Sequence, residues 1–113
     1  MANVYLKFLQ NIASLEPIQF KHKDLSPTAI LLLNEIAVKD FEEQPLKVTQ
    51  AMGFNALGSP ANLHRKINEL LDAGMISLSY KGNNRRTKYI TLTQAATDYF
   101  QTMSKAMLEA VEC

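Results

Sequence analysis

The stretch from Ser59 to Thr93 constrains the fold of this chain most, because a helix pattern there runs directly into a basic hairpin pattern. Its sequence is SPANLHRKINELLDAGMISLSYKGNNRRTKYITLT. Serine followed by proline favours a helix start, because the hydroxyl caps the first turn and proline needs no N–H bond there. Gly74 favours a helix end, because glycine adopts the left-handed conformation that terminates many helices. We therefore expect a helix over residues 59–73 with a hairpin after it.

The hairpin is predicted from alternation. Residues 75–80 alternate between apolar side chains and serines, which is the period of two typical of a strand. Residues 86–92 alternate again, and the Gly-Asn-Asn sequence between the two runs favours a tight turn. A helix followed by a hairpin with a basic tip is the core of a winged helix, which most often binds duplex DNA.

The rest of the chain is predicted to be helical. Apolar residues recur at helical spacing in four more segments, which are residues 2–15, 26–37, 46–52 and 93–113. The segments 46–52 and 59–73 are joined by a short glycine-containing turn and make a helix-turn-helix. The predicted fold class is therefore mainly α (α+β). We expect one winged helix-turn-helix domain over residues 1–113, with a two-stranded β wing and flanking N- and C-terminal helices.

The net charge of +1 conceals an asymmetry. Between Ser59 and Leu92 there are six basic and two acidic residues, whereas the remainder carries six basic and nine acidic ones. A basic segment on an otherwise acidic body is the expected electrostatic footprint of a phosphate-binding surface. Chance clustering of charge is the alternative, since local asymmetry is common in small domains.

The predicted helix 59–73 would enter the major groove N-terminus first, as the second helix of a helix-turn-helix does. Its expected solvent face comprises Ala61, Asn62, Arg65, Lys66 and Glu69. Arginine can form a bidentate pair with guanine, and asparagine with adenine. A helix N-terminus can hold a phosphate. The wing, residues 81–88, is expected on the minor groove or its phosphates. The predicted DNA-binding residues are Ser59, Ala61, Asn62, His64, Arg65, Lys66, Lys81, Asn84, Arg85, Arg86 and Lys88.

Several of these residues also have a simpler interpretation. Asn62 and Lys66 can be ordinary solvated residues, and Arg65 can form a surface bridge with Glu69, worth ~0.3–0.5 kcal/mol. His64 can be merely exposed, and a basic hairpin tip is usually only a solvated turn. Because a fold does not fix a function, a winged helix that serves as a protein–protein interaction module without DNA binding is the alternative.

Three pieces of the sequence together resemble the MarR family of bacterial transcription regulators: LSPTAILLL, SPANLHRKINELLDAGMI and NNRRTKYITLT. The resemblance covers about residues 25–100 and implies sequence-specific binding to double-stranded DNA by a bacterial transcriptional regulator. The positions that match base-contacting residues of the family are Ser59, Asn62, His64 and Arg65. The resemblance also places Arg85 at the wing tip and makes Arg86 a bracing arginine.

The chain departs from the family pattern in three places. Asn83 and Asn84 stand where an acidic residue is usual, which puts the expected salt bridge of the wing in doubt. The pair Ala95-Ala96 replaces the usual glycine after Leu-Thr, and the chain has one C-terminal helix rather than two. A shorter chain leaves less room for an effector pocket. A small-molecule effector is thus possible but not indicated, and constitutive or partner-controlled binding stays open.

The first and last predicted helices carry more apolar side chains than a small winged helix needs. We expect residues 1–16 and 93–113 to pair across a two-fold axis, which would make the protein a homodimer. The alternative is that both helices wrap the core of a monomer.

Other classes of function find little support in the sequence. His22 and His64 lie in different predicted elements, Cys113 is terminal, and no catalytic, metal-ligand or phosphate-loop spacing occurs. We therefore expect no enzyme activity, no metal and no cofactor. No apolar run approaches the ~20 residues of a membrane span, and the N-terminus lacks the pattern of a signal peptide. We expect a cytoplasmic protein without a membrane partner.

Overall fold

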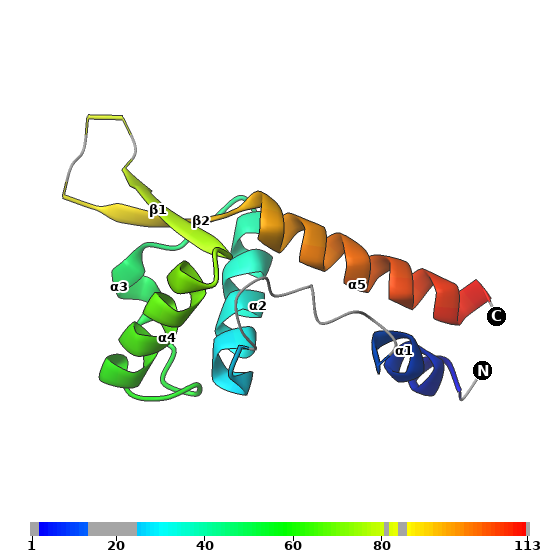
Figure 1. Cartoon of the computed structure of the whole chain (residues 1–113). Coiled ribbons are helices and arrows are strands. Elements are labelled where there is room, and N and C mark those ends of the chain that lie inside the picture. Colours follow the sequence, from blue (N-terminus) through cyan, green and yellow to red (C-terminus); the bar gives the residue numbers. More distant parts are fainter. Residues whose placement is uncertain (1–2, 14–24, 81, 84–85, 113) are drawn as a thin grey trace.

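The computed structural model describes residues 3–13, 25–80, 82–83 and 86–112. Its elements follow the order α1 (Val4–Ala13), α2 (Pro27–Phe41), α3 (Val48–Ala51), α4 (Pro60–Asp72), β1 (Ile76–Tyr80), β2 (Lys88–Leu92) and α5 (Gln94–Glu112). Figure 1 shows the hairpin of β1 and β2 projecting from a body built on α2, α3 and α4. The predicted winged-helix fold class is confirmed.

The helix starts predicted from serine-proline pairs are confirmed. The Ser26 hydroxyl accepts a hydrogen bond from the backbone N–H of Ala29 at 3.3 Å, and the Ser59 hydroxyl accepts one from Asn62 at 3.2 Å. Each hydroxyl thus satisfies one of the orphan donors of a helix N-terminus. At the other end of α4, Gly74 has φ of 74°, the left-handed conformation expected there.

The core lies where α2 and α4 meet the inner face of the hairpin. Its largest fully buried side chains are Leu32, Leu33, Ile36, Leu63, Leu70, Met75 and Ile90. In the antiparallel hairpin Ile76 lies opposite Leu92 and Tyr80 opposite Lys88. Fully burying a side chain of this size stabilises the fold by about 1.5–3 kcal/mol. This packing fixes the orientation of α4 against α2.

The expected helix over residues 46–52 is shorter than predicted. Its first two residues are extended instead, because the Leu46 carbonyl accepts a hydrogen bond from the N–H of Ile90 at 2.8 Å and Lys47 forms a β-bridge with Tyr89. The Leu46 side chain is buried in the core, and its backbone pairs with the otherwise open edge of β2. The consequence is that Lys47 lies at the base of the wing.

Thr93 joins four elements at one point. Its hydroxyl donates to the Gly74 carbonyl at 2.6 Å, and its N–H donates to the Met75 carbonyl at 3.2 Å. The same hydroxyl oxygen accepts a hydrogen bond from the N–H of Ala96 and so caps α5. The end of α4, the start of β1, the end of β2 and the start of α5 are therefore held together.

Helix α1 lies beside the far half of α5, away from the wing (Figure 1). The Asn11 side-chain amide donates to the Ala106 carbonyl at 3.0 Å, and no residue of α1 is buried. The predicted first helix extends over residues 14–15, which lie outside the described part of the chain. None of the helices in the described ranges is long and apolar enough to cross a membrane.

Candidate nucleic-acid interface

Helix α4 presents a polar face that differs from the predicted one by a small rotation. Leu63, Ile67 and Leu70 are buried as expected. The exposed residues on the opposite side are Ala61, His64, Arg65 and Asn68. The other three members of the predicted solvent face, Asn62, Lys66 and Glu69, lie at the flank and are half-buried. Asn68 was missed by the sequence analysis, although its position one turn after His64 could have indicated it.

Glu69 binds the N-terminus of α2. Its carboxylate accepts a hydrogen bond from the backbone N–H of Ser26 at 2.7 Å and another from the Ser26 hydroxyl at 3.1 Å. A third partner is the Lys66 ammonium at 3.4 Å. A negative charge at this position also complements the positive end of the dipole of α2. The carboxylate thus links the candidate recognition helix to its neighbour.

The charge state of Glu69 follows from these contacts. Partial burial raises the pKa of the carboxyl group, but the two hydrogen bonds from Ser26 and the Lys66 ammonium lower the pKa by more. The net pKa lies below its ordinary value of 4.5. Glu69 is therefore ionised at neutral pH and remains directed to Ser26 and Lys66.

Arg65 does not form the surface bridge with Glu69 that the sequence allows. In the described part of the chain, the carboxylate of Glu69 is paired with Lys66, and no carboxylate oxygen lies within 4.0 Å of the Arg65 guanidinium. His64 Nδ1 lies 3.5 Å from the side-chain nitrogen of Asn68. The exposed face of α4 thus offers a guanidinium, an imidazole and an amide to an external partner.

The wing is described only in part. Lys81, Asn84 and Arg85, three of the predicted contact residues, lie outside the described ranges. Arg86 and Lys88 are exposed, Arg86 in a bend that precedes β2 and Lys88 at the first position of β2. The bracing role expected of Arg86 stays a prediction.

Solved structures resemble this chain over nearly its whole length. A transcriptional regulator from Thermotoga maritima superimposes with a TM-score of 0.66 at 12% identity, covering 96% of this chain and 68% of that one. The zinc-responsive MarR family member ZitR from Lactococcus lactis matches with a TM-score of 0.54 at 18% identity, covering 98% of this chain and 78% of that one. The chain has a MarR-like winged-helix fold. ZitR in complex with DNA matches with a TM-score of 0.50 at 21% identity, covering 99% and 78% of the two chains.

The likeness is one of structure. Neither a family model nor a curated protein matches the sequence of this chain. Within the described ranges, the MarR-like fold of this chain contains no group of three or more His, Cys, Asp or Glu residues that could hold a metal ion.

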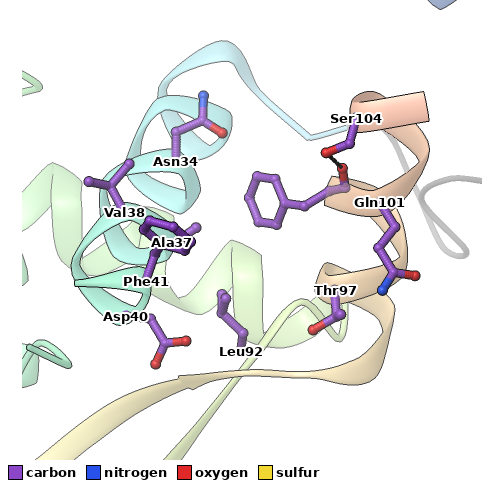
Figure 2. Close-up of a pocket in the computed structure, with 10 residues that line it drawn as sticks. Asn34, Ala37, Val38, Asp40, Phe41, Leu92, Thr97, Gln101 and Ser104 are labelled. Atoms are coloured by element: carbon purple, nitrogen blue, oxygen red, sulfur yellow. Dashed lines mark hydrogen bonds between the residues drawn. The ribbon is translucent and has the colours of Figure 1, made fainter. Parts of the chain in front are cut away.

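An open groove of about 470 Å³ separates α2 from α5. Figure 2 shows side chains of α2 on one wall, Thr97 and Gln101 of α5 on the other, and Leu92 of β2 between them. The Ser104 hydroxyl donates to the Phe100 carbonyl at 2.9 Å and is thereby occupied within α5. The groove is largely apolar, with Asp40 and Asn34 at its margin. The groove has room for a small molecule, although no described contact selects one.

Proposed function

We propose that this protein is a transcriptional regulator that binds double-stranded DNA sequence-specifically as a homodimer. The recognition helix, residues 59–73, would lie in the major groove, and the wing, residues 81–88, on the minor groove or its phosphates. The MarR-like fold supports this proposal, since structures with that fold include transcriptional regulators and one complex with DNA.

The observation that carries the proposal is the direction of Glu69. Residues 60–68 include no acidic residue, and Glu69, the first acidic residue of α4, is turned toward Ser26 and Lys66 at the flank of the helix, so it adds no carboxylate to the face that exposes Arg65. A carboxylate on this face would repel the phosphates that border a groove. Its removal to the flank leaves an exposed arginine on a surface that is suited to a polyanion.

Arg65 is the residue best suited to discriminate bases. Its guanidinium is exposed near the middle of α4 and can donate two parallel hydrogen bonds to the O6 and N7 atoms of guanine. His64 and Asn68 flank it on the same face. Ser59 accepts from Asn62, and its hydroxyl proton can still donate to a phosphate oxygen. Lys66 would contribute less than the sequence suggested, because Glu69 already neutralises it.

The homodimer is supported by an apolar surface on the two terminal helices. This distal apolar surface comprises the exposed side chains of Tyr5, Leu6, Leu9, Met107, Leu108 and Val111. Helices α1 and α5 cover each other only in part, and a second copy could bury the remainder. Two recognition helices related by a two-fold axis would then contact half-sites about 34–36 Å apart.

The test is a selection of bound sequences from random duplexes, followed by affinity measurements on the selected site. We expect a palindromic site. Arg65→Ala should lose about 1–3 kcal/mol on that site and much less on unrelated duplexes. Lys105→Ala is the matched control, because this exposed cation lies on α5, outside the proposed interface. It should bind both duplexes like the unaltered protein.

The interaction-module alternative gives the opposite result. A protein of that kind would select no sequence, and its weak binding to duplex would be unaffected by Arg65→Ala. A preference for a site that survives Arg65→Ala unchanged would remove α4 from the proposed interface.

A further inference from the structure

A second hollow, of about 370 Å³, lies where α3 meets the base of the wing. We call it the basic hollow. Its lining consists of Lys47, Val48, Thr49, Arg86, Thr87 and Lys88. Three of these six residues are basic, two carry hydroxyl groups and none is acidic. The combination of cations and hydroxyl donors is the one that binds a phosphate group in proteins.

The hollow is built by the pairing that shortens α3. Because Lys47 bridges to Tyr89 and Leu46 is bonded to Ile90, the start of α3 is fixed against the returning strand of the wing. The Gln50 side chain accepts a hydrogen bond from the N–H of Lys47 at 2.9 Å, which fixes the turn into α3. Residues 47–49 and 86–88, which are distant in the sequence, thereby line the same hollow. These backbone contacts and the Gln50 side chain fix the start of α3 beside the wing.

The cations of the hollow remain accessible. Lys47, Arg86 and Lys88 are all exposed. In the described part of the chain, the ammonium groups of Lys47 and Lys88 have no carboxylate partner within 4.0 Å. The like charges of Lys47 and Lys88 repel each other, and no carboxylate in the described part of the chain pairs with either one. An anion in the hollow would relieve that repulsion, so the arrangement favours binding a doubly or singly charged phosphate.

We infer that the basic hollow binds a phosphate group, which is a backbone phosphate of duplex DNA when the protein is on its site. This inference rests on the proposed function for the source of the phosphate, but not for the chemistry. In a helix-turn-helix the first helix crosses the DNA backbone while the second enters the groove. Helix α3 is that first helix, and it lies next to the hairpin of the wing (Figure 1). Residues of both line the hollow. A phosphate held there would fix the wing and α4 in one register on the duplex.

Lys47 provides the sharpest test, because it lies outside both the recognition helix and the wing. We would measure affinity for the selected duplex by fluorescence anisotropy over about 50 to 200 mM salt, where binding falls with the number of phosphates neutralised. For Lys47→Gln the slope of log affinity against log salt should decrease by about 0.9, as for the loss of one phosphate contact. Lys88→Gln should have a similar effect, and Lys105→Gln, with the same change in charge, should have none.

A titration with inorganic phosphate tests the hollow without DNA. The backbone amide NMR signals of Val48, Thr49 and Lys88 should shift as phosphate is added, and the shifts should be absent in Lys47→Gln. Duplex binding with an unchanged salt slope in both lysine variants overturns the inference, even though the proposed function stands. If the unaltered protein binds no duplex, the proposed function fails, and the phosphate titration alone then tests the basic hollow. Signal shifts that depend on Lys47 would support a phosphate site there. The absence of such shifts would overturn the inference.

Discussion

Replacing Glu69 by alanine should destabilise the fold by about 2 kcal/mol, although the residue lies on a helix whose outer face is exposed. A hydrogen bond to a charged group contributes about 1.5–3 kcal/mol. Glu69 accepts one such bond at 2.7 Å and a longer one at 3.1 Å, both from Ser26. Its side chain is 21% exposed, so water replaces part of what is lost. The Lys66 pair adds only about 0.3–0.5 kcal/mol.

Urea unfolding followed by far-UV circular dichroism measures this loss directly. Glu35→Ala is the matched control, because Glu35 is an exposed glutamate inside α2 and the substitution has the same effect on helix propensity. The control should lie within about 0.5 kcal/mol of the unaltered protein. Glu69→Gln should be intermediate, since it keeps an acceptor but not the charge. Equal effects of Glu69→Ala and Glu35→Ala would refute the link between α4 and α2.

The same contact should make stability depend on pH in a defined direction. The pKa of Glu69 is lower in the folded protein than its ordinary value of 4.5, so the unfolded chain binds the proton more tightly. The stabilisation is complete above that ordinary value and is lost as the pH falls through the lower folded pKa. The stability difference between the unaltered protein and Glu69→Gln should therefore shrink at acidic pH. A difference that is constant from neutral to acidic pH would contradict an ionised carboxylate.

Three further substitutions test other parts of the structure. Gly74→Ala should lower the free energy of unfolding by about 1–2 kcal/mol in a urea titration, because an alanine is strained at φ of 74° even though nothing blocks its methyl group. Thr93→Val should lose about 1–2 kcal/mol, because the Gly74 carbonyl and the N-terminus of α5 both lose a partner. Leu108→Glu should convert the proposed dimer to a monomer in sedimentation experiments. Val38→Glu makes the same kind of change at an exposed position of α2, outside the distal apolar surface, and should leave the dimer intact.

The elements of the fold could be predicted because their signals are local. Serine-proline pairs mark two helix starts, and the capping hydrogen bonds they predict span only three residues. Gly74 marks a helix end in the same way. The alternation of β1 and β2 identifies a hairpin because both strands need one buried face. Each of these signals depends on a few neighbouring residues and survives in a single sequence.

The candidate site was less predictable because its decisive contacts are long-range. Glu69 and Ser26 are 43 residues apart, and helical spacing offered Arg65 as an equally good partner. The helical spacing of apolar residues gave the inner face of α4 correctly, but it did not show that Asn62 and Lys66 would be half-buried at the flank. Asn62 lies against Gly58, and Lys66 pairs with Glu69. Lys47 had no local signal at all, since its position depends on an edge of β2 that is formed much later in the chain.

The junction at Thr93 has a mechanical consequence for the proposed dimer. Helix α5 has 19 residues, which makes it about 28 Å long, and it starts at a point bonded to the end of α4. A change of about 5° in its direction at Thr93 would move its far end by about 2.4 Å over that length. The distal apolar surface lies at that far end, so in the proposed dimer a small change in the direction of α5 at Thr93 would change the separation of the two recognition helices. The tolerance of the proposed dimer for half-sites of different spacing would then depend on how firmly the hydrogen bonds of Thr93 hold the start of α5.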